Sequence, residues 1–121
     1  MDNTKLNNLN ILDLMGKTSL SDLANLLKFS QKNICFDSGT MHLADAIQSN
    51  LLAIFGPTNI KKNKPKNSTS QYIYKEVSCS PCILGWNFVE NYISEKEAYN
   101  DCKSNFKCME NISVEDVLRL I

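Results

Sequence analysis

The sequence has very little arginine, histidine, glycine or proline for its 121 residues. Arg119 is the single arginine and His42 the single histidine, so bidentate arginine clamps on phosphate are almost excluded. Thirteen basic residues balance thirteen acidic ones, and this zero net charge argues against a nucleic-acid-binding protein. Any phosphate group must therefore be bound by backbone N–H groups, hydroxyls or lysines.

Long hydrophobic runs are also lacking. No stretch approaches the ~18 consecutive apolar residues that a membrane-spanning helix needs. The first seven residues are mostly polar and have no apolar core of the signal-peptide type. We therefore expect a cytoplasmic protein, with at most peripheral contact with the inner face of a membrane.

The length allows one domain at most, and a hydrophobic fraction of 43% is ordinary for a globular protein. Apolar runs and helical periodicity alternate along residues 1–58. They predict strands at 10–14, 33–36 and 51–55, and helices at 19–28 and 40–49. This order predicts an α/β fold with a Rossmann-like parallel sheet.

The remaining chain is less regular. Residues 59–77 form a polar loop with lysines at 61–66, followed by a weak strand at 72–77. The lysines indicate a solvated loop, or a contact with an anionic acceptor or lipid headgroups. Residues 78–111 contain four cysteines, and residues 112–121 predict a closing helix with Ser113 and Asp116 as a capping box.

Three loops follow the three predicted strands, and ligands bind at the carboxyl ends of parallel strands. The loops are Gly16-Lys17-Thr18, Asp37-Ser38-Gly39-Thr40 and Gly56-Pro57-Thr58. Each contains a glycine, which permits close approach of a ligand to the backbone, and a hydroxyl that can bond it. The first loop is not a nucleotide P-loop, because Ile11 stands where that motif needs a glycine.

The middle loop has two interpretations. With Gly39 opening a helix, the free N–H groups of the first turn form an anion site. Asp37 can then cap the helix, bond a sugar hydroxyl, or position His42. On spacing alone, a plain helix cap and a satisfied, half-buried His42 explain the same residues.

The loops taken together resemble a known family. The runs Leu14-Met15-Gly16-Lys17-Thr18-Ser19-Leu20, Phe36-Asp37-Ser38-Gly39-Thr40-Met41-His42-Leu43-Ala44 and Ile54-Phe55-Gly56-Pro57-Thr58 are similar to the C-terminal half of family 9 glycosyltransferases. Cys79-Ser80-Pro81-Cys82, Cys108-Met109 and residues 112–117 also fit. The best-known members are bacterial ADP-heptose:lipopolysaccharide heptosyltransferases.

The resemblance implies the two-domain GT-B architecture, with a nucleotide sugar such as ADP-heptose held mainly by the C-terminal domain. It implies that residues 1–121 are part of that domain and that heptose or a related sugar passes to the lipopolysaccharide core. The donor-binding residues it implies are Lys17 and Thr18 at the adenine pocket, Asp37 near the ribose or sugar, Ser38, Gly39 and Thr40 at the diphosphate, His42 beside it, and Gly56 and Thr58 in the pocket wall.

The sequence also departs from the family pattern. Asn59-Ile60 follows Gly-Pro-Thr where the family commonly has Asp-Pro. No residue matches the catalytic carboxylate, which belongs to the N-terminal domain of the family. We therefore expect no catalytic residue in this chain and no sugar transfer by it alone. It is then either half of a split enzyme with a separately encoded N-terminal acceptor domain, or a non-catalytic remnant or interaction module.

Four of the five cysteines lie in the less regular segment. Cys79, Cys82, Cys102 and Cys108 can form a four-thiolate zinc site, or they can be free thiols or redox pairs. The first alternative would make the chain a small metal-binding protein. The glycosyltransferase resemblance itself requires no cofactor.

Overall fold

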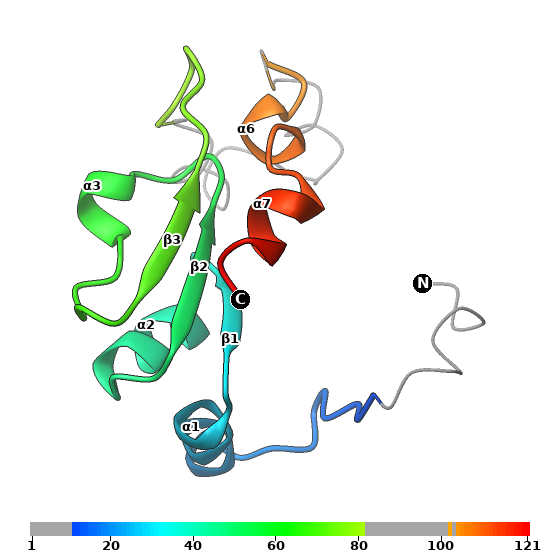
Figure 1. Ribbon diagram of the computed structural model, residues 1–121, viewed down its shortest axis with the longest axis vertical. Helices are drawn as coiled ribbons and strands as arrows, with labels where there is room; N and C mark the ends of the chain where they lie inside the picture. Colours follow the sequence, from blue (N-terminus) through cyan, green and yellow to red (C-terminus); the bar gives the residue numbers. More distant parts are fainter. Residues whose placement is uncertain (1–10, 82–101, 103) are drawn as a thin grey trace, which may run out of the picture.

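The computed structural model describes residues 11–81, 102 and 104–121. Its centre is a parallel sheet with the order β1-β2-β3, formed by Asn33–Phe36, Leu51–Phe55 and Gln71–Tyr74 (Figure 1). Five helices accompany the described strands: α1 Leu20–Phe29, α2 Gly39–Ala46, α3 Ile60–Asn63, α6 Lys107–Glu110 and α7 Val114–Leu118. This arrangement confirms the predicted Rossmann-like α/β fold.

The helix α1 begins where the sequence predicts it. The Ser19 side chain accepts a hydrogen bond from the Asp22 N–H, and the Asp22 carboxylate accepts one from the Ser19 N–H. This capping box satisfies two of the N–H groups that a helix start leaves free. Leu27 is buried on the face of α1 that packs against α2 and the sheet, whereas Leu20 is largely exposed.

The central strand β2 is the core of the molecule, because all five of its residues are buried. Leu51, Ala53 and Phe55 contact Met41 and Ala44 of α2 on the face covered by helices. On the other face lie Leu52 and Ile54, both buried. In Figure 1, α2 and α3 lie on one side of the sheet and α6 and α7 on the other.

The strand predicted at residues 10–14 is wrong within the described residues 11–14, which form no strand. The Asp13 carboxylate accepts the Met15 N–H, and the Lys17 N–H bonds the Leu14 carbonyl. Gly16, with φ +69°, completes a tight turn that glycine accommodates without strain. Local turn bonds therefore replace strand pairing there, and β1 is an edge strand of the described sheet.

The other boundaries differ less. β3 ends at Tyr74, earlier than predicted, and α3 forms inside the segment expected to be a loop. The closing helix has the predicted Ser113–Asp116 capping box. Its apolar face is only partly covered, because Val114 and Leu118 are exposed. A capping box sets where a helix starts, whereas burial depends on a neighbouring surface.

Candidate functional site

The first turn of α2 is open to a ligand. Ser38 is the N-cap residue, with extended backbone, but its side chain makes no capping hydrogen bond. The first helical bond runs from the His42 N–H to the Ser38 carbonyl, so the preceding N–H groups have no acceptor within the helix. A Cβ placed on Gly39 would meet no atom within 4 Å. This helix end can therefore accept an anion closely.

Asp37 precedes this turn and is almost buried, with 9% of its side chain exposed. One carboxylate oxygen, Oδ2, accepts a hydrogen bond of 2.8 Å from the Asn63 amide. The other, Oδ1, lies 3.7 Å from Nε2 of His42, whose side chain is 56% exposed. Of the roles open to Asp37 from sequence, the geometry favours positioning His42 over capping α2.

The loop after β2 leaves the sheet beside the Asp37 loop, because Phe36 and Ile54 are partners in the parallel ladder. The Thr58 hydroxyl oxygen in this loop is buried and has no hydrogen-bond partner among the described residues. A buried hydroxyl without a partner is costly, and a bound ligand could satisfy it. Gly56 has a packing role as well, because Met109 of α6 lies directly against it.

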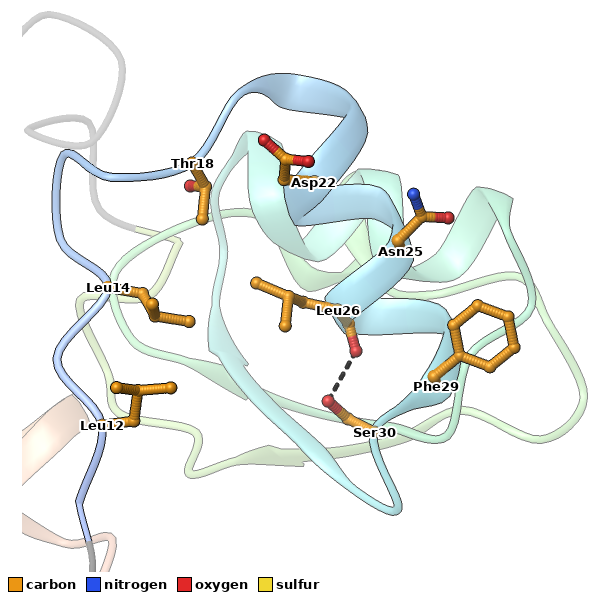
Figure 2. Close-up of a pocket in the computed structure, with 8 residues that line it drawn as sticks. All are labelled: Leu12, Leu14, Thr18, Asp22, Asn25, Leu26, Phe29 and Ser30. Carbon is orange, nitrogen blue, oxygen red and sulfur yellow. Dashed lines mark hydrogen bonds between the residues drawn. The ribbon is translucent and has the colours of Figure 1, made fainter.

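Gly16, Lys17 and Thr18 occupy a different setting from the other predicted donor residues. The Lys17 ammonium donates a hydrogen bond of 3.0 Å to the Asp13 carbonyl. Thr18 lines an open groove of about 560 Å³ between residues 12–18 and α1 (Figure 2). Leu12, Leu14, Leu26 and Phe29 make most of the groove apolar, and none of the Asp37–His42 residues lines it. The adenine-pocket assignment of Lys17 and Thr18 stays a prediction.

Sequence reasoning missed two polar residues that shape this site. Asn63 holds Asp37, as described above, and Asp45 holds the segment that follows α3. The Asp45 carboxylate accepts hydrogen bonds from the backbone N–H groups of Lys66 and Asn67 and from the Ser70 hydroxyl, at 2.9, 3.0 and 3.1 Å. The lysine-rich loop is therefore tied to α2. Asp45 lies three residues after His42, a spacing that puts both on one helix face.

The Asp45 bonds predict a pH-dependent contribution to stability. Burial alone would raise the pKa of Asp45, but the bonds from Lys66, Asn67 and Ser70, with the nearby His42, lower it overall. A carboxyl whose pKa is lower in the folded state stabilises the fold above its unfolded pKa, near 3.9. That stabilisation is lost as the pH falls through the folded value.

We therefore expect Asp45→Asn to lower the free energy of unfolding by about 1 kcal/mol at pH 7, and by less at pH 3. Urea titrations from pH 7 to pH 3 measure this difference. The pKa values of Asp22 and Asp116 are also lowered, by capping bonds and, for Asp116, by Lys75. The wild type and Asp45→Asn share both groups, so their contribution cancels in the difference. The exposed Glu115→Gln is the matched control. An Asp45→Asn deficit that is equal at both pH values would contradict the expectation.

The cysteines show no metal site in the part that the structure describes. Cys79 and Cys102 are half-buried free thiols, Cys108 is buried, and Cys82 lies outside the described residues. No group of three metal-ligating side chains occurs among the residues described. The four-thiolate zinc site therefore stays a prediction. None of the described helices is long and apolar enough to cross a membrane.

The chain is similar in sequence to known proteins of one family. Residues 2–93 match the model of glycosyltransferase family 9 (heptosyltransferase). Two relatives are the lipooligosaccharide heptosyltransferases 2 of Campylobacter jejuni serotypes O:2 and O:6, 31% and 30% identical over 80 residues. Each alignment covers 65% of this chain and 25% of the relative. The enzyme of that name from Haemophilus influenzae is 32% identical over 62 residues, 51% of this chain and 18% of the relative.

No solved structure matches the chain significantly. The chain spans about a quarter of the length of the Campylobacter relatives. The family model, by contrast, covers most of the chain and contains the Asp37 and Gly56 loops at the carboxyl ends of β1 and β2. The chain belongs to glycosyltransferase family 9.

Proposed function

We propose that this chain is the donor-binding region of a heptosyltransferase-like glycosyltransferase of the GT-B type. The observation that carries the proposal is the uncapped first turn of α2, with open space over Gly39. A diphosphate placed there would accept hydrogen bonds from the backbone N–H groups of this turn and from the Thr40 hydroxyl. With only one arginine in the chain, backbone N–H groups of this kind are, with hydroxyls and lysines, the phosphate ligands that it offers.

The sugar end of the donor would meet Asp37 and His42. A carboxylate accepts hydrogen bonds from sugar hydroxyls, and Oδ1 of Asp37 has no hydrogen bond within 3.5 Å among the described residues. The buried Thr58 hydroxyl supplies a further group for a ligand to satisfy. ADP-heptose is the donor we propose, with the lipopolysaccharide core as acceptor, because the similar proteins are lipooligosaccharide heptosyltransferases.

Transfer of the sugar needs more than these residues. No residue of the chain is assigned a catalytic role. We propose that a separately encoded N-terminal domain supplies the acceptor site and the catalytic carboxylate, and that this chain works at the cytoplasmic face of the inner membrane.

The test is calorimetry with ADP-heptose and with ADP. We expect Gly39→Val to weaken binding of both ligands about tenfold or more, because the side chain would occupy the space that the diphosphate needs. Ala46→Val, on the exposed far end of α2, is the matched control and should bind as the wild type does. Equal affinities of the Gly39→Val and wild-type proteins would refute this location. Wild-type protein that binds neither ligand would favour the non-catalytic module.

A further inference from the structure

Asn63 reaches Asp37 across 26 residues of sequence. It is the last residue of α3, which follows β2, whereas Asp37 follows β1. The hydrogen bond from Nδ2 of Asn63 to Oδ2 of Asp37 is 2.8 Å long and partly buried. It therefore joins the loops that leave two neighbouring strands at the edge where the proposed donor site lies.

α3 is itself held at both ends, so the Asn63 amide has a fixed position. The Asn59 side chain caps the helix by accepting the Lys61 N–H, and the Asn63 N–H bonds the Asn59 carbonyl. Ile60 packs against the hydrophobic core. Beyond α3, the bonds to Asp45 tie the chain to α2 again. An anchored donor of this kind can hold a neighbouring carboxylate in one orientation.

Because the Asn63 side chain is a neutral amide, it determines which charge and which hydrogen-bonding oxygen Asp37 keeps for a ligand. A lysine or arginine in the place of Asn63 would neutralise the carboxylate, whereas a neutral amide leaves its negative charge in place. With Oδ2 occupied, Oδ1 is the oxygen turned toward His42. At 9% exposure, the side chain has little freedom to exchange its two oxygens.

We infer that Asn63 is a positioning residue for the sugar moiety of a nucleoside diphosphate sugar. By holding Oδ2 of Asp37, it directs Oδ1 toward His42 and the open end of α2, ready to accept a bond from a sugar hydroxyl. This inference rests on the proposed function. It separates the two parts of the ligand: the first turn of α2 binds the diphosphate, and the Asn63–Asp37 pair recognises the sugar.

The experiment compares ADP, which has no transferred sugar, with ADP-heptose. Calorimetry on the wild type, Asn63→Ala and the exchanged double variant Asp37→Asn/Asn63→Asp gives the affinities, and thermal unfolding gives the stabilities. We expect Asn63→Ala to weaken ADP-heptose binding about tenfold, the loss of one good hydrogen bond to a charged group, and to leave ADP binding within about twofold. Asn67→Ala is the control from the same segment, because the Asn67 side chain bonds nearby Thr69 and no other residue that the structure describes.

The double variant separates positioning from simple tethering. It restores an amide–carboxylate pair between the two loops, so its stability should recover, but it moves the charge from position 37 to position 63. We expect its ADP-heptose binding to stay weak. Recovery of ADP-heptose binding in the double variant would show a purely structural tether. Equal losses for ADP and ADP-heptose in Asn63→Ala would show that the pair does not recognise the transferred sugar. Either result would overturn the inference.

The remaining outcomes distinguish this inference from the proposed function. Wild-type protein that binds ADP-heptose, with an Asn63→Ala variant of unchanged affinity for it, overturns the role of Asn63 and leaves the donor site standing. Wild-type protein that binds neither ligand overturns both. Measurable binding of ADP-heptose by the wild type therefore distinguishes failure of the Asn63 role from failure of the proposed donor site.

Discussion

Phe55→Ala is expected to lower the free energy of unfolding by about 3–5 kcal/mol. Among the described residues, Phe55 has the largest fully buried side chain, and it closes the core between β2 and α2. Its ring also meets the Tyr72 ring edge to face, with centroids 6.3 Å apart. Alanine would remove these contacts and leave a cavity that strands held by ladder hydrogen bonds cannot fill by moving together.

Chemical denaturation monitored by circular dichroism measures the loss. A small domain is stable by only about 5–15 kcal/mol, so this loss is a large fraction of the total stability. Phe29→Ala makes the same chemical change at a ring that is 83% exposed, and we expect it to be nearly neutral. Similar losses for the two variants would show that the sheet does not pack as described.

Gly56→Val is expected to lower the free energy of unfolding by about 1–3 kcal/mol, the second large effect. Even a Cβ at this position would run into Sδ and Cγ of Met109, and Cys108 lies behind them. The methionine side chain can move aside, but two added methyl groups exceed the space that its movement would free. The valine therefore pushes α6 away from the end of β2.

A compensating substitution tests this explanation. Met109→Ala shortens the opposing side chain, so Gly56→Val/Met109→Ala should recover much of the stability lost in Gly56→Val, relative to Met109→Ala alone. Gly39→Val is the matched control, since no atom lies within 4 Å of a Cβ there. Thermal unfolding of the wild type, the two single variants at positions 56 and 109 and the double variant completes the cycle. Additive losses at positions 56 and 109 would contradict a direct contact.

The elements that sequence predicts correctly are those defined by local chemistry. β1 and β2 have the predicted bounds because short apolar runs between turn residues have few alternatives. The starts of α1 and α7 follow from capping boxes, which need residues only three positions apart. In each case, the signal and the structure it causes lie within a few residues.

The failures depend on residues far apart in sequence. Residues 11–14 have the composition of a strand, but a strand forms only where another strand can pair with it, and composition does not report that. The bond between Asn63 and Asp37 joins two segments 26 residues apart, and a polar residue in a lysine-rich stretch carries no sign of such a partner. The likeness to family 9 identified the loops, but not the residue that braces one of them.

The candidate site was predicted in the same uneven way. Parallel strands predict that the Asp37 and Gly56 loops share an edge, and the ladder pairing of Phe36 with Ile54 confirms it. The Gly16 loop does not follow a strand in the structure, so the prediction of three converging loops holds for two of them. The sequence left several roles open for Asp37; the structure places its carboxylate 3.7 Å from His42, and its role toward a sugar stays a prediction.

The order of the strands in the sheet bears on how the chain assembles during synthesis. In the described sheet, β1, β2 and β3 are neighbours in the same order as they leave the ribosome. β2 and β3 therefore each find a partner strand already made, and each connection to be closed is short and contains one helix. β2 gains both neighbours only when β3 has emerged, so one edge of β2 is unpaired for the interval between the two. The polar segment from Asn59 to Ser70 sets the length of that interval.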